Sequence, residues 1–464
     1  MSTPNILFIT DDQHRWDFYD NRTVPTLNVP TLTRLQQQGT TFTHAYSNCP
    51  MCMPTRMTWV HALYASQVAD GLMHNWHKWP THLASMPAAL QNHGYTTAMI
   101  GKLHAQGKWR NDLTHFEEEA RGRGFDYVWE VCGKSFAENV DCHWTHYLDS
   151  KGLLERYRKD LTRRVESSGG TEPSDPSFLK TEDHMDSFIG RRVCAWLDNY
   201  NGQQPFYLHA SFCGPHFPID PPEEYACRYS VDDIPDPVGV EDPEKIRYWK
   251  KRTAAYCAMI EHVDTEIGRV LETLERRGMA RDTLVIFGTD HGDMMGHHDR
   301  AHKGWAYDTS CRTPYILHWP GKIPAGVVRK DMVEAVDLPI TVLEAAGVKE
   351  FPQKLLPSTP GRSFLQAALG NGNGSRQWVY SEVGNTLVGY LGDQNGWRMV
   401  REQDYKYVNM PGGHELFFDM VADPWETSNR ATDPDLQPQL QRMRLELIDS
   451  LRQCITPSQW RIGE

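Results

Sequence analysis

The chain has 464 residues, of which 39% are hydrophobic and 11% aromatic, enough to bury a large apolar core. Its formal net charge is −12 and no block of lysines and arginines stands out, which excludes a typical nucleic-acid-binding surface. An anionic substrate must therefore be held by a local group of cations, because the overall field repels it.

The start of the chain and its cysteines bear on the compartment. Met1 is followed within a few residues by the strand-like NILFIT, and not by a basic region and an apolar core. No apolar run approaches the roughly 20 residues of a membrane-spanning helix. Ten cysteines at irregular spacing are typical of reduced thiols. We therefore expect a cytoplasmic enzyme with no membrane partner, either a monomer or a homo-oligomer.

Short apolar runs rich in β-forming residues recur along the first part of the chain. They are NILFITDD (5–12), YTTAMIGKLH (95–104), PFYLHASF (205–212), DTLVIFGTDHGD (282–293) and PYILHWPG (314–321). None of them alternates regularly between polar and apolar residues, which favours strands that are buried on both faces.

Helical patterns lie between these runs, in MDSFIGRRVCAWLDNY (185–200), YCAMIEHVDTEIGRVLETLERRG (256–278) and LPITVLEAAG (338–347). The longest one ends at Gly278, a typical C-cap, and places six apolar residues on one face: Ile260, Val263, Ile267, Val270, Leu271 and Leu274. Strands alternating with helices predict an α/β fold, a large mostly parallel sheet between helices, with its site at the carboxyl ends of the strands.

A second, smaller unit is expected after GNGNGS (370–375), which has the composition of a domain boundary. The segments QWVYSEV, GWRMVREQDYKYVN and ELFFDM are typical of antiparallel strands joined by turns. From about Pro434 to Cys454 the leucine spacing predicts a helix. We therefore divide the chain into a catalytic α/β domain, residues 1–370, and an α+β domain, residues 376–464.

Two of the predicted strands end in acidic residues. The first ends in Asp11-Asp12, and another ends in Asp290-His291. Like charges this close cost energy unless a cation binds them, so two neighbouring strands could supply carboxylates and an imidazole to one divalent ion. Oxygen-rich ligands suit Ca²⁺, Mg²⁺ or Mn²⁺, and the histidine also admits Zn²⁺. The alternative is that Asp11-Asp12 is an ordinary polar loop cap.

The stretch NCPMCMPTR has two interpretations. Cys49 and Cys52 have the spacing of a dithiol redox pair, but that leaves the acidic strand ends unexplained. Alternatively, Cys52 is the working residue at the start of a helix over residues 54–67, where free N–H groups and the helix dipole lower a thiol pKa and attract an anion. Arg56, one turn into that helix, would hold an oxyanion or the nucleophile. A third interpretation is that Cys52 is merely buried.

Together the motifs resemble the sulfatase family of the alkaline phosphatase superfamily, along nearly the whole chain. NILFITDDQ is similar to the opening metal strand, CMPTR to the sulfatase signature, GKLHAQG to the Gly-Lys-x-His element and GPHFP to the Pro-His-x-Pro loop. GTDHGDMMGHH and the following HKGWAYDTSCRTPYILHWPG resemble the second metal strand and its lysine segment. ELFFDMVADPWETSNRA resembles the C-terminal Leu-x-Asp-x-x-x-Asp-Pro-x-Glu stretch. Their number and order make the resemblance specific.

The resemblance implies a cofactor and a set of site residues. A formylglycine-generating enzyme would oxidise Cys52 to formylglycine, whose hydrate is the nucleophile. One divalent cation, Ca²⁺ or Mn²⁺, would be held by Asp11, Asp12, Cys52, Asp290 and His291. The catalytic residues would be Cys52, Arg56, Lys102, His104, His216 and Lys303, with Gln13 beside them.

The implied mechanism gives these side chains distinct roles. Lys102 and Lys303 would neutralise charge on the transferred group. His216 would protonate the departing alkoxide, and His104 would take the proton whose removal expels sulfate. Arg56 would steady the formylglycine. The alternative for each of these lysines and histidines is a solvated or structural residue.

Two features depart from the common pattern. Where the signature usually continues Leu-Thr-Gly-Arg, this chain has Val60, His61, Ala62 and Leu63; the core Cys-x-P-x-R is intact, and we expect conversion of Cys52. Asp290-His291 replaces the Asp-Asn of many sulfatases, and the Asp-His pair occurs both in other sulfatases and in phosphonate monoester hydrolases. The expected activity is hydrolysis of a small organic sulfate monoester; the alternatives are a phosphonate monoester or phosphodiester hydrolase and, more remotely, a binding protein with unmodified Cys52.

Overall fold

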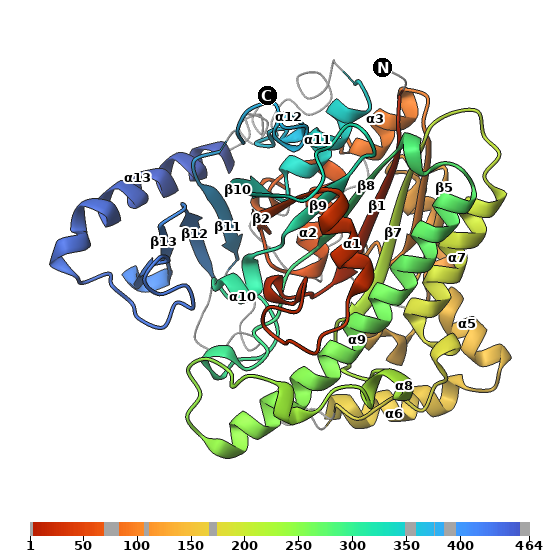
Figure 1. Cartoon of the computed structure of the whole chain (residues 1–464), viewed down its shortest axis with the longest axis horizontal. Helices are drawn as coiled ribbons and strands as arrows, with labels where there is room; N and C mark the ends of the chain where they lie inside the picture. Colours follow the sequence, from red (N-terminus) through yellow and green to blue (C-terminus); the bar gives the residue numbers. More distant parts are fainter. Residues whose placement is uncertain are drawn as a thin grey trace, which may run out of the picture.

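The computed structural model describes residues 3–68, 83–105, 111–166, 174–348, 359–374, 376–384 and 396–454. Part of the GKLHAQG motif, Ser375 of the boundary segment and the last ten residues lie outside these ranges. A sheet of eight strands in the order β10-β2-β9-β8-β1-β7-β3-β5 forms the centre of the fold (Figure 1). Its strands are β1 (Asn5–Asp12), β2 (Thr40–Tyr46), β3 (Thr96–Gly101), β5 (Tyr127–Glu130), β7 (Phe206–Pro215), β8 (Thr283–Thr289), β9 (Tyr315–His318) and β10 (Val327–Glu334).

The sheet is mostly parallel, as the sequence predicts. Strand β1 runs parallel to both β7 and β8, and β3 runs parallel to β5 and β7. Strand β9 is the exception, because it pairs antiparallel with β2 and with β8. The register of β1 and β8 pairs Asn5 with Thr283 and Asp11 with Thr289, so the two acidic strand ends are adjacent.

Helices cover both faces of this sheet, because β1 sends alternate side chains to opposite sides. Ile6 and Phe8 belong to one buried apolar cluster, and Leu7 and Ile9 to another. The first cluster includes α2 (Cys52–His61), α3 (Met86–Asn92) and α11 (Asp337–Ala345). The second includes α1 (Pro30–Gln38), α5 (His143–Ser150), α6 (Leu154–Glu166), α7 (Met185–Asn199) and α9 (Pro243–Arg276).

The longest helix, α9, confirms the apolar face read from the sequence, since all six of its named residues are buried. It begins earlier than the pattern indicated, at Pro243, where the Asp242 side chain accepts a hydrogen bond from Glu244 N. Gly278, just beyond its end, has the φ of 70° expected of a C-terminal cap. Helix α7 lies beside α9 on the same face (Figure 1).

The expected helix over residues 54–67 is wrong at both ends. Helix α2 starts at Cys52 and stops at His61, because Ala62 adopts a left-handed conformation with φ 54°. This is the position where the common family pattern has glycine. Ala62 takes this conformation although its Cβ makes it less favourable than for glycine.

A second sheet confirms the antiparallel strands expected near the C-terminus. It has the order β11 (Val379–Val383), β12 (Trp397–Arg401), β13 (Tyr405–Asn409) and β14 (Glu415–Asp419). Helix α13 (Gln437–Cys454) packs against β12 and β13 (Figure 1). The apolar cluster under α2 continues without a break into this sheet. The domain division at residues 370 and 376 stays a prediction.

Several short elements complete the described structure. They are α4 (Glu117–Arg121), α8 (Glu223–Ala226), α10 (Asp308–Cys311), α12 (Leu365–Ala368), and the two-stranded pair β4 (Asn111–Asp112) and β6 (Val140–Asp141). All ten cysteines are free thiols. Within the described ranges, no helix combines the length and apolarity needed to cross a bilayer.

Candidate active site

Four buried side chains converge where β1 and β8 end. The ligand atoms of Asp12, Cys52, Asp290 and His291 all lie within 4.8 Å of one another. His291 Nε2 is 3.2 Å from Cys52 Sγ and 3.6 Å from Asp290 Oδ1. Cys52 Sγ is 3.8 Å from Asp12 Oδ1. The parallel register of the two strands brings residues nearly 280 positions apart to one point.

Cys52 is the first residue of α2 and is buried. Lys303 Nζ lies 3.0 Å from its sulfur. Burial and the Asp12 carboxylate raise the pKa of the Cys52 thiol, but Lys102, Lys303 and His291 outweigh them, so that the net pKa is lowered. The side chain at position 52 therefore faces a local cationic environment in an acidic protein.

Arg56 ties the converging elements together from one turn inside α2. Its guanidinium donates to Asp290 Oδ2 (2.9 Å) and to Asp12 Oδ2 (3.0 Å). It also donates to the Lys102 carbonyl (2.6 Å) and to Ser211 Oγ (2.7 Å). Arg56 thus joins α2 to the ends of β1, β3 and β8 and to the middle of β7, and it neutralises two carboxylates that would otherwise repel each other.

Lys102 and His104 follow directly after β3. Lys102 Nζ is 2.5 Å from Asp12 Oδ2, and this ion pair holds the pKa of the Asp12 carboxyl well below its usual range although burial opposes the shift. His104 has φ 60°, and its backbone N–H donates to Glu130 Oε1 at 2.9 Å. Burial, followed by Lys102 and Arg56, lowers the pKa of His104 well below its usual value. His104 is therefore a neutral imidazole at pH 7.

Lys303 links three of the expected site residues. Its Nζ lies 2.7 Å from His216 Nε2 and 2.8 Å from Gln13 Oε1, besides its contact with Cys52. His216 Nδ1 is 2.7 Å from the Phe217 carbonyl, so Nδ1 carries the proton and Nε2 accepts from the lysine. Burial and the Lys303 ammonium both lower the pKa of His216 well below its usual value.

Asp11 is not among the four side chains whose ligand atoms lie within 4.8 Å of one another. Its Oδ2 is 2.6 Å from His14 Nδ1. Its Oδ1 is buried and has no hydrogen-bond partner among the described residues. The predicted role of Asp11 as a ligand stays a prediction.

The donor set fits a divalent cation. Two carboxylates and an imidazole surround the side chain at position 52, and all four residues are buried. A buried carboxylate oxygen without a partner, such as Asp11 Oδ1, is costly unless a cation or water satisfies it.

Some contacts of the site are made by residues that the sequence analysis did not identify. Ser211 on β7 donates to the Lys102 carbonyl at 2.8 Å and holds Arg56. Asp293 accepts from the Gln13 side chain. Asp293 lies within the TDHGD stretch, but nothing in that motif distinguishes a residue that orients Gln13 from a further metal ligand.

The dithiol interpretation of Cys49 and Cys52 finds no support in their surroundings. Both are free thiols. Cys49 lies in the apolar cluster under α2, and burial followed by Glu382 raises the pKa of its thiol well above the usual value. A redox pair needs an accessible thiolate of lowered pKa. Of these two cysteines only Cys52 has a lowered pKa, and its side chain is buried.

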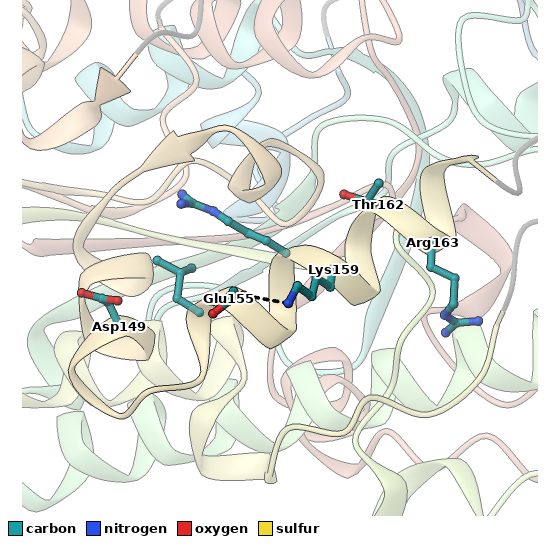
Figure 2. Close-up of a pocket in the computed structure, with 7 residues that line it drawn as sticks. Asp149, Glu155, Lys159, Thr162 and Arg163 are labelled. Carbon is teal, nitrogen blue, oxygen red and sulfur yellow. Dashed lines mark hydrogen bonds and ion pairs between the residues drawn. The ribbon is translucent and has the colours of Figure 1, made fainter.

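A separate hollow of about 740 Å³ lies on the surface over α5 and α6 (Figure 2). It is lined by Asp149, Leu154, Glu155, Arg158, Lys159, Thr162 and Arg163. Glu155 and Lys159 form an exposed ion pair one helical turn apart, at 2.7 Å. None of the converging residues lies in this hollow, so its size does not make it the reaction site.

Comparison with known proteins agrees with the geometry. The profile of the Sulfatase family matches residues 4–348. The chain belongs to the sulfatase family. A second profile, N-sulphoglucosamine sulphohydrolase, C-terminal, matches residues 296–453. This family member is accordingly a sulfuric ester hydrolase with an alkaline phosphatase-like fold.

Relatives of this sulfatase-family chain include both sulfatases and phosphonate hydrolases. It is 24% identical to an arylsulfatase of Clostridium perfringens, over 97% of this chain and 94% of that one. It is 26% identical to the multifunctional alkaline phosphatase superfamily protein PehA of Trinickia caryophylli, over 94% and 92% of the two chains. The crystal structure of the phosphonate monoester hydrolase of Agrobacterium radiobacter superposes with a TM-score of 0.80 at 21% identity, covering 97% and 96%.

Proposed function

We propose that this chain hydrolyses organic sulfate monoesters at the four converging side chains, after Cys52 has been converted to formylglycine. The observation that carries the proposal is the convergence of Cys52 with Asp12, Asp290 and His291 inside 4.8 Å. In the structure the residue is an unmodified cysteine, and its sulfur marks where the side chain of the modified residue would lie. The formylglycine hydrate would supply the nucleophilic hydroxyl.

One divalent cation, Ca²⁺ or Mn²⁺, would be held by Asp12, Asp290, His291 and the residue at position 52, with Asp11 as a further candidate. When bound, it would supply Lewis-acid chemistry, lowering the pKa of a hydroxyl and neutralising developing charge. Arg56 already spans Asp12 and Asp290, so the two carboxylates are fixed before a cation arrives.

The cations of the site would bind and orient the sulfate group. Lys303 Nζ contacts Cys52 Sγ directly. Lys102 Nζ contacts Asp12, which is one of the residues around Cys52. Two fixed ammonium groups stabilise charge on the transferred group more than water does, because the site is buried and the side chains are already oriented.

Proton transfer to the leaving group would use the Lys303–His216 pair. His216 Nε2 accepts from Lys303, so a proton from the ammonium can reach Nε2 and then the departing alkoxide. His216 is half-buried whereas Lys303 is buried, so the imidazole is the more exposed member of the pair. His104, held neutral, would take the proton whose loss releases sulfate.

Hydrolysis of phosphonate monoesters is the second candidate. It is favoured by the structural similarity to the phosphonate monoester hydrolase. Sulfate monoesters remain the first choice because the Sulfatase profile covers most of the chain. The same cationic side chains would hold a sulfate or a phosphonate group, so the hydrolysis rates of the two esters must decide between the candidates.

The test combines mass spectrometry with kinetics on protein produced in its native host. The peptide that spans Cys52 should carry an aldehyde in place of the thiol, and Cys49 in the same peptide should remain a thiol. An aryl sulfate should be turned over faster than a phenyl phosphonate ester. An intact thiol at position 52 in an inactive protein would instead support a binding protein, and a faster phosphonate rate would support the second candidate.

A further inference from the structure

The loop that carries Lys303 is held by the C-terminal sheet. The Gly304 carbonyl accepts a hydrogen bond from Trp397 Nε1 on β12 at 2.8 Å. The Ala306 carbonyl accepts from Lys406 Nζ on β13 at 3.1 Å. These two carbonyls lie one and three residues after Lys303, the lysine that contacts Cys52. The backbone of this loop is therefore fixed by the C-terminal sheet, whereas the acidic strand ends belong to the large sheet.

Lys406 is at the centre of a fully buried polar group. Besides the Ala306 carbonyl, its ammonium contacts Asp308 Oδ1 (2.5 Å) and Glu426 Oε1 (2.6 Å). Three donors therefore meet three acceptors. Glu426 closes the group, because its Oε2 accepts from the Asp308 backbone N–H at 2.7 Å. Glu426 is the glutamate of the ADPWE stretch, so one function of that motif is to accept hydrogen bonds from Lys406 and from the Asp308 backbone.

The lysine loop needs such support. His302 and Gly304 on either side of Lys303 both have positive φ, 61° and 88°, so the loop is tightly bent at this point. The lysine side chain has four methylene groups and many rotamers. Its Nζ nevertheless meets Cys52, Gln13 and His216 within 2.7–3.0 Å. Only a fixed backbone leaves it a single geometry.

We propose that Trp397 and Lys406 are positioning residues for Lys303, which makes the C-terminal sheet part of the catalytic unit. This inference rests on the proposed function, since it takes Lys303 as the residue that acts on the transferred group. A sheet that only stabilised the fold would change the amount of folded enzyme, and not the rate of each folded molecule. A positioning role therefore predicts a lower kcat for the folded enzyme, and a purely stabilising role predicts an unchanged kcat.

The test uses Trp397→Phe, which removes one N–H donor and keeps an aromatic ring in the core. We expect kcat on an aryl sulfate to fall about three- to tenfold, the rate equivalent of one hydrogen bond, with KM changed less than twofold. Val408→Ala is the matched control. Val408 is buried in the same apolar cluster, and its backbone pairs only within the sheet, with Met399 and Leu416. This variant should be less stable but keep the wild-type kcat.

A double-mutant cycle with Lys303→Met shows whether the effect passes through the lysine. Trp397→Phe should lower kcat in the wild type and change it less than twofold in the Lys303→Met background. Equal losses in both backgrounds would overturn the positioning role and leave the proposed function intact. A Lys303→Met enzyme with wild-type kcat would overturn the role of Lys303, and with it the positioning role, but not sulfate hydrolysis. A wild-type protein that does not hydrolyse the aryl sulfate would overturn the proposed function.

Glu426→Gln provides a second route if Trp397→Phe does not fold. In Glu426 one carboxylate oxygen accepts from Lys406 and the other from the Asp308 N–H. In glutamine an NH₂ group, which cannot accept, replaces one of these oxygens, so one of the two bonds is lost. The same fall in kcat and the same non-additivity with Lys303→Met are expected. An unchanged kcat in folded Glu426→Gln would refute the role of Lys406.

Discussion

Replacing Arg56 with methionine should test the electrostatic core of the site. The change removes a guanidinium that donates to Asp12, Asp290, Ser211 and the Lys102 carbonyl. Methionine fills most of the volume, so the loss reports the charge and the hydrogen bonds more than a cavity. Both carboxylates then remain buried with their mutual repulsion uncompensated on that side.

The expected loss of unfolding free energy is about 3–5 kcal/mol, the cost of removing one partner from a buried ion pair. Both ion pairs are at 3.0 Å or less, and none of the three side chains is exposed. Arg276, which pairs with Asp198 at 2.9 Å but is 62% exposed, is the matched control. Arg276→Met should cost no more than about 0.5 kcal/mol.

Urea unfolding in chelator and again in saturating Mn²⁺ provides the assay. Because the cation would neutralise the same two carboxylates, the loss in Arg56→Met should be smaller with Mn²⁺ than in chelator. A loss below about 1 kcal/mol in chelator, or one of equal size with and without Mn²⁺, would show that Arg56 and the cation do not share these carboxylates. Arg276→Met should not respond to the metal.

Three further outcomes are expected. Cys52→Ala should fold normally and abolish ester hydrolysis, whereas Cys49→Ser should keep more than half of the activity; the reverse order would favour a dithiol mechanism. Asp290→Asn should weaken Mn²⁺ binding at least tenfold by calorimetry, and unchanged affinity would place the cation elsewhere. Burial raises the pKa of Glu130 from 4.5 to about 7. The unfolded state therefore ionises first, and as pH rises from about 4.5 to 7 this group should cost about 3 kcal/mol of stability. Urea midpoints at pH 5 and pH 7.5 should show this loss of stability in the wild type and a smaller loss in Glu130→Gln. Equal losses in the two proteins would show that Glu130 is not the group responsible.

The acidic ends of strands β1 and β8 could be predicted from the sequence because they depend on local patterns. Each begins as an apolar run long enough to be buried on both faces, and each ends in residues that are poor choices for a core. Strand β9 was expected as a strand, but its reversed direction was not, because an apolar run gives no sign of which way it runs. Strands β2, β5 and β10 of the large sheet were not predicted: β2 and β10 contain polar residues that interrupt the apolar pattern, and β5 is only four residues long.

The different surroundings of Asp11 and Asp12 show where local reasoning ends. Adjacent residues of a strand point to opposite faces. Asp12 meets Lys102 and Arg56, while Asp11 meets His14. The sequence offers two identical carboxylates side by side, and only the packing of α2 and β3 against one face tells them apart.

By itself the sequence determined the residue types of this site, the strands that end there and the cysteine at a helix start, because those follow from periodicity and from the chemistry of each side chain. Tertiary structure decided which of them meet. Three features join residues that are far apart in the chain: the parallel register of β1 and β8, the hydrogen bonds of Arg56 to four strands, and those of the C-terminal sheet to the Lys303 loop. Such contacts depend on how the elements pack, and no short stretch of sequence contains that information.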